Sequence, residues 1–155
     1  MYDWVVLIHI LGVLGFMFSH GISAAMALRL RHERNADRIR VILQVSSSAT
    51  GLLYVSILLL LVGGVWAGFS GDWWDQGWIW LALGVFVANL VLMWTYAAPY
   101  YKKIREVMTI EESGSSAVGA DDLEALLGTN RAIVLAWVGL ASIAFIAYLM
   151  VIKPF

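Results

Sequence analysis

The sequence predicts an all-α integral membrane protein, an up-down bundle of four transmembrane helices. Of the 155 residues, 61% are hydrophobic and only 14% are charged, whereas soluble domains carry roughly 25% charged residues. This composition argues against a soluble enzyme, a disordered chain and a nucleic-acid-binding protein. A helix needs ~20 apolar residues to cross ~30 Å of hydrocarbon. Four stretches without Lys, Arg, Asp or Glu are at least that long: 4–28, 41–71, 76–101 and 132–152.

A single membrane domain, 1–155, is therefore expected. Helices are expected in each stretch because backbone groups in lipid must be hydrogen-bonded within the segment, and because barrel strands would alternate polar and apolar residues. The first stretch is a retained helix and not a signal peptide, since Arg29 and Arg31 stand where a cleavage site would be. Pro99 is expected to end or kink the third helix. The expected helices cover approximately 4–30, 40–68, 77–99 and 131–152, and a cytoplasmic connection covers 100–130.

The distribution of positive charge predicts the orientation. Nine of the ten Lys and Arg residues lie in the first and third connections, and Lys153 is the exception. The positive-inside rule assigns these connections to the cytoplasm, so both termini face outward (N-out/C-out). The partner expected for the whole chain is the lipid bilayer.

Polar side chains at membrane depth are the candidate functional residues, because they are costly there. His9 and His20 are eleven residues apart. On an α-helix this spacing puts the two side chains within about 20° of the same face and separates them by roughly 16 Å along the axis. This spacing suits two metal centres, one in each leaflet, and imidazole is a common axial ligand of haem. Gly12 lies beside the histidine face and gives a macrocycle room to approach. Asn89, near the middle of the third helix, can hydrogen-bond a histidine or a propionate.

A second interpretation assigns the same residues to helix packing. Two histidines can hydrogen-bond across helices, and Gly15, Ser19 and Ser23 form a small-xxx-small pattern for close helix contact. If haem is bound, its second ligand is a methionine, the same histidine of a second copy, or absent; the candidate methionines are Met17, Met93 and Met150. Copper handling is a third interpretation, since His and Met are copper ligands. There is no cysteine, so thiolate sites are excluded.

The opening segment also resembles a known superfamily. Tyr2-Asp-Trp-Val-Val-Leu-Ile-His9-Ile-Leu-Gly-Val-Leu-Gly, closed by Arg29-Leu-Arg-His32, is similar to the first helix of small bacterial membrane proteins of the CopD-like and HemJ-like superfamily. The resemblance implies haem b on the first-helix histidine, matched here by His9, and a bacterial inner (cytoplasmic) membrane. Where the HemJ-type protoporphyrinogen oxidases have a Pro-Arg-rich end to this helix, the chain has Ala24-Ala-Met-Ala-Leu-Arg-Leu. The nearest resemblance is to a branch of unassigned function.

The function expected from these observations is that of a haem-b-binding electron-transfer protein, either alone or as a subunit of a larger redox complex. A non-catalytic membrane subunit or scaffold is the alternative, and copper handling is the third. Whether the chain is an enzyme is left open. A homodimer or docking to a membrane complex is expected from the small residues of the first two helices, and no nucleic-acid partner is expected. The candidate cofactor-binding residues are His9, His20, Gly12 and Asn89, with His9 and His20 as the metal ligands.

Overall fold

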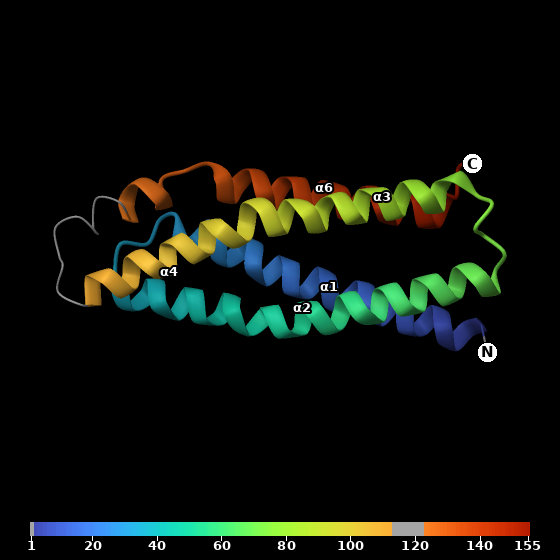
Figure 1. Cartoon of the computed structure of the whole chain (residues 1–155), viewed down its shortest axis with the longest axis horizontal. Coiled ribbons are helices and arrows are strands. Elements are labelled where there is room, and N and C mark those ends of the chain that lie inside the picture. The colour runs from blue at the N-terminus through green and yellow to red at the C-terminus, as the bar shows by residue number, and fades with distance from the viewer. Residues whose placement is uncertain (1, 113–122) are drawn as a thin grey trace.

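Long antiparallel helices make up the molecule, as the computed structural model in Figure 1 shows. The structure describes residues 2–112 and 123–155, and the side chains of 109–112 are outside this description. Within these residues, four helices are long and apolar enough to cross a membrane, which confirms the predicted all-α membrane class. Both termini lie at the same end of the bundle. The elements are α1 (Tyr2–Leu30), α2 (Ala36–Ser70), α3 (Gly77–Leu92), the π-helical η1 (Met93–Ala97), α4 (Ala98–Glu112) and α6 (Arg131–Ile152).

Helix α2 begins earlier than the expected residue 40, at Ala36. Asn35 has extended backbone and its side-chain oxygen accepts a hydrogen bond from the backbone N–H of Arg38 at 3.1 Å. This N-cap satisfies one of the free N–H donors of the first turn. The carboxylate of Asp37 in the same turn interacts favourably with the positive end of the helix dipole. The α1–α2 connection is consequently shorter than the charge pattern alone indicates.

The third helix does not end near Pro99. Helices α3 and α4 follow one another through η1, so one long rod runs from Gly77 to Glu112 and occupies part of the expected connection 100–130. A proline lacks the backbone N–H, and its ring clashes with the carbonyl four residues earlier, here Thr95. The wider turn of η1 lies directly before Pro99, and the N–H of Ala98 reaches back to the carbonyl of Met93. The proline is thus accommodated by a π-helical turn. Residues 113–122 of the expected connection lie outside the described residues.

Helices α1 and α2 pack closely along a seam of small residues. A Cβ on Gly12 would come within 2.8 Å of the Cα of Leu60, and one on Gly63 within 2.7 Å of the backbone N of His9. Gly15 faces the hydroxyl of Ser56 across the same seam. Real Cβ atoms do not approach backbone this closely, so only glycine allows these two helices to touch. The second pair, α3 with α6, lies beside them (Figure 1).

The centre of the bundle is filled with apolar side chains. Phe16 of α1, Leu53 of α2 and Phe86 of α3 are buried together, and Ile143 and Ile146 of α6 pack against them. A second, larger apolar cluster lies at the end of the bundle away from the termini. It joins the end of α1 and the start of α2 to α4 and the helical turn at 123–127; its buried members are Leu30, Ile39, Ile42, Leu43, Tyr100, Ile104, Val107, Met108, Leu123 and Leu127.

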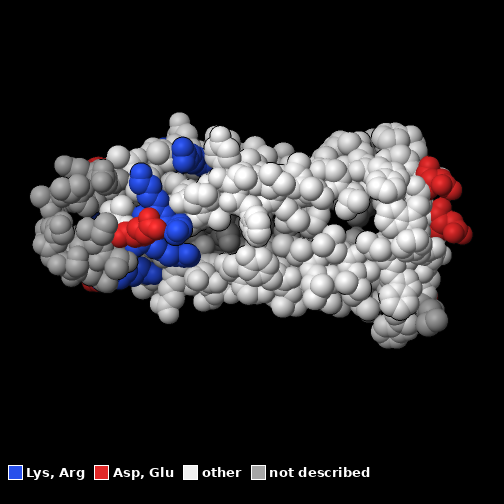
Figure 2. All heavy atoms as spheres, in the orientation of Figure 1, with Lys and Arg blue, Asp and Glu red and all other residues white. Residues whose placement is uncertain are grey.

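Charged residues are concentrated at the two ends of the long axis of the molecule (Figure 2). Figure 2 shows Lys and Arg gathered near the end opposite the termini, with a long uncharged surface between them and acidic residues at the other end. The C-terminus contacts the α2–α3 loop and the start of α3 at that other end. The ammonium of Lys153 lies 3.8 Å from the ring centre of Trp73, and the backbone N–H of Trp78 donates to the carbonyl of Phe155 at 3.3 Å. An uncharged belt between two polar ends is the arrangement that a bilayer requires.

Candidate functional site

His9 lies at the contact between α1 and α2. Its Nδ1 is 2.8 Å from the carbonyl oxygen of Leu60. A carbonyl can only accept a hydrogen bond, so Nδ1 carries the proton and donates it. In the neutral ring Nε2 then holds a free lone pair, and it points away from Leu60 because the two ring nitrogens face different directions. The ring of His9 is therefore held in one tautomer and one orientation.

Two glycines of α2 provide the space that the His9 ring occupies. A Cβ on Gly64 would lie 2.9 Å from both Nδ1 and Cε1 of His9, and a Cβ on Gly63 would meet its backbone. Larger residues would displace the imidazole from the Leu60 carbonyl. Both glycines are thus used for a contact within one chain, against His9 of α1. Two adjacent glycines inside an uncharged helix were the signal in the sequence for such a close approach.

His20 lies against a different helix. Its ring stacks on Phe16, with centroids 6.0 Å apart and planes 9° from parallel, and its edge points at Gly139 of α6. A Cβ on Gly139 would be 2.6 Å from Cε1 of His20, and Nε2 is buried without a hydrogen-bond partner within the described part of the chain. The two histidines, expected to serve two separate metal centres, contact different neighbours, α2 and α6. Helix rise still separates them by roughly 16 Å.

The other two candidate residues are engaged in local contacts. Gly12 is buried against the backbone of α2 at Leu60, so α2 fills the space beside it. The side-chain amide of Asn89 donates to the carbonyl of Val85, one turn earlier in α3, at 3.3 Å. Neither residue contacts a histidine through the hydrogen bonds that the structure describes. Both remain predictions as cofactor-binding residues.

The candidate methionines are spread over the bundle. Met17 is 45% exposed on α1, Met93 packs on the cluster around Phe16, and Met150 packs on a cluster near the termini. No group of three or more His, Cys, Asp or Glu side chains is placed to share a metal ion among the described residues.

Comparison with known proteins gives a family-level match. A family model described as a predicted integral membrane protein (DUF2269) matches residues 3–154. Neither the curated proteins nor the solved structures contain a significant match to the chain.

Proposed function

The chain belongs to the DUF2269 family of predicted integral membrane proteins, and from this premise we propose that it binds haem b through His9 and transfers electrons in a bacterial cytoplasmic membrane. The observation that carries the proposal is the hydrogen bond from Nδ1 of His9 to the carbonyl of Leu60. Metal-ligating histidines almost always donate their other ring N–H to a carbonyl or carboxylate, which fixes the ring and makes the ligating nitrogen more basic. When bound, haem iron would supply one-electron chemistry by alternating between its ferric and ferrous states.

The packing of the bundle supports a peripheral position for such a haem. Phe16, Leu53 and Phe86 fill the centre, and Gly12 leaves no space between α1 and α2. His9 would therefore hold the haem at the side of α1, next to lipid or a partner. A second ligand, if there is one, would be the His9 of a second copy, a residue of a larger redox complex or a methionine of this chain.

His20 does not fit the same role in this arrangement. Its Nε2 is turned into α6 at Gly139, so a ligand could reach it only if α1 and α6 separated. We restrict the proposal to His9, and His20 serves as the matched control because it lies on the same helix and is also partly buried.

A visible spectrum tests the proposal. The full-length protein, purified from haem-replete membranes, is expected to show a Soret band that shifts on reduction with dithionite, and its extracted pigment should be haem b. His9→Ala should lose or strongly alter the band, whereas His20→Ala should retain it. Acidification should release the haem, because only neutral imidazole ligates iron. Equal spectra for His9→Ala and the unchanged protein would exclude His9 as the ligand, and copper found by elemental analysis in place of iron would favour copper handling.

The second candidate function is that of a non-catalytic membrane subunit. The small residues of α1 and α2 support it, since Gly12, Gly15 and Gly63 are all used in close helix packing. A folded, colourless protein without metal, recovered from haem-replete cells, would favour this function over the first.

A further inference from the structure

A groove of mixed character runs between the end of α1 and the first turns of α2. It is lined by Arg29 and Arg38 on its polar side and by Met26, Val41 and Val45 on its apolar side. We propose that this groove, here called the connection groove, binds an anionic phospholipid, with the phosphate at the two arginines and an acyl chain along the apolar wall.

The polar half of the groove offers free guanidinium donors. The side chain of Arg29 is exposed and forms no salt bridge in the described part of the chain. The side chain of Arg38 is 73% exposed and lies 3.9 Å from Oε2 of Glu33, which leaves most of its five N–H donors available. Guanidinium groups match the oxygens of a phosphate through paired hydrogen bonds. The two arginines come from the ends of adjacent helices and flank one groove.

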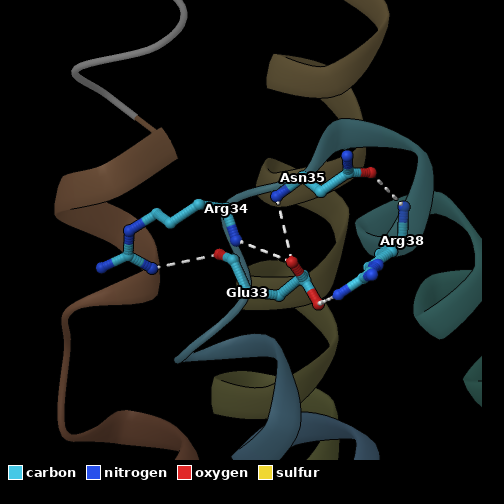
Figure 3. A network of polar contacts seen from close by, with 4 residues as sticks. All are labelled: Glu33, Arg34, Asn35 and Arg38. Atoms are coloured by element: carbon cyan, nitrogen blue, oxygen red, sulfur yellow. Dashed lines mark hydrogen bonds and ion pairs between the residues drawn. The ribbon is translucent and has the colours of Figure 1, made fainter.

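The carboxylates in the groove are already bonded within the protein. Oε1 of Glu33 accepts the backbone N–H groups of Arg34 and Asn35, each at 3.1 Å, while its other oxygen faces Arg38 (Figure 3). Asp37 accepts a hydrogen bond from Arg40 at 2.8 Å. Glu33 therefore holds Arg38 at the groove, and neither carboxylate is left as an uncompensated negative charge facing an anion.

The positive charge that matters is local to the groove, because this end of the chain as a whole is nearly balanced, with nine Lys and Arg against eight Asp and Glu. The acidic side chains that the structure describes there are all ion-paired: Glu33 with Arg38, Asp37 with Arg40, Glu106 with Lys102 and Glu124 with Arg34. Arg29 and the exposed part of Arg38 therefore leave positive charge at the groove, next to the apolar belt, where it attracts anionic lipid.

The apolar half of the groove distinguishes a lipid from a free phosphate. Val41 and Val45 are 59% and 43% exposed and lie one turn apart on the same face of α2. They stand at the start of the uncharged stretch 41–71 of α2, directly after Arg38 and Arg40 in the sequence. A headgroup bound at Arg29 and Arg38 would place its chains beside these valines, so the groove accommodates both parts of a phospholipid.

Native mass spectrometry of the full chain with added phosphatidylglycerol tests the assignment. Arg29→Gln with Arg38→Gln should weaken phosphatidylglycerol binding about tenfold or more, because the guanidinium groups that would hydrogen-bond the phosphate are removed. The control, Lys102→Gln with Lys103→Gln, removes the same charge from α4, outside the groove, and should weaken binding by a clearly smaller factor, because it changes only the long-range attraction. Arg29→Lys with Arg38→Lys should restore part of the binding.

Three results would overturn the proposal. Equal losses in the two double variants would show that only net charge matters. Equal binding of phosphatidylcholine would show that the anionic headgroup is not recognised. Inorganic phosphate that competes as effectively as phosphatidylglycerol, with no effect of Val41→Asn or Val45→Asn, would show that the apolar wall binds no chain. Lipid binding is measured only on folded protein. The unfolding temperature of each variant shows separately whether the substitution has impaired folding.

Discussion

At the residue level, the two membrane-embedded histidines of α1 pack against glycines, which have no side chain. Gly64 admits the ring of His9, and Gly139 admits the ring of His20. The difference between the two lies in the second ring nitrogen. His9 uses Nδ1 on the Leu60 carbonyl and keeps Nε2 available, whereas His20 has Nε2 buried against α6. The hydrogen bond of Nδ1 to Leu60 therefore makes His9 the candidate ligand, whereas His20 is a packed side chain.

Glu33 provides a prediction at this scale, because its position outside the membrane makes it accessible to protons. The pKa of its carboxyl is lower than usual, first because it accepts the N–H of Asn35, and also because of the N–H of Arg34 and the charges of Arg38 and Arg29. Because the folded-state pKa is lowered, the unfolded chain binds the proton more readily than the folded one. The ionised Glu33 carboxylate therefore stabilises the folded protein above the ordinary glutamate pKa of about 4.3. This stabilisation is lost as the pH falls through the lower folded-state pKa.

The expected result is a pH-dependent effect of Glu33→Gln. At pH 7 the variant should unfold at a lower temperature than the unchanged protein, and the gap should close once both are measured well below pH 4.3, the ordinary value. Glu106→Gln, which removes an exposed carboxylate paired with Lys102 at 3.7 Å, is the control. A gap that stays constant from pH 7 to acid would mean that the charge of Glu33 does not stabilise the connection.

At the scale of secondary-structure elements, close packing of α1 on α2 organises the bundle. Lipid tails are as apolar as leucine, so helices in a membrane associate through packing and hydrogen bonds. Gly12, Gly15 and Gly63 bring the two backbones together, while Gly21 and Gly51 on the same two helices have no neighbour within 4 Å of an added Cβ. Position along the helix, and not the presence of glycine, determines which residues form the seam.

Gly12→Ala should therefore destabilise the protein by about 1–3 kcal/mol, the usual cost of overpacking, since its new methyl group would collide with the backbone of Leu60. Gly21→Ala is the matched variant on the same helix; it meets open space and should be neutral or stabilise by about 0.5–1 kcal/mol. Thermal unfolding in a mild detergent measures both. If the two variants unfolded at the same temperature, the seam would not be a rigid contact.

At the scale of the whole molecule, the distribution of Lys and Arg predicts how the bundle is oriented. Lys and Arg gather at the end opposite the termini, as Figure 2 shows, and the positive-inside rule predicts that this end is cytoplasmic. In that orientation the connection groove would face the cytoplasmic leaflet, and His9, nearer the end with the termini, would lie in the outer half of the membrane.

Cysteine labelling tests this orientation, because the chain contains no cysteine of its own. His32, in the α1–α2 connection, and Ser70, the last residue of α2, are exposed residues near opposite ends of the bundle. In intact cells, Ser70→Cys should react with a membrane-impermeant maleimide and His32→Cys should react only after the membrane is permeabilised. The reverse pattern would invert the topology and move the connection groove to the outer leaflet.

The membrane class, the number of membrane-spanning helices and the end at which positive charge gathers could all be predicted from the sequence, because they follow from the lengths of uncharged stretches and the places of Lys and Arg. The sequence also singled out His9 and His20. The contacts of His9 with Leu60 and of His20 with Gly139 could not be predicted, since the periodicity of one helix says nothing about which neighbour covers its face. The same reason explains the continuation past Pro99, where a π-helical turn, visible only in the backbone, accommodates the proline.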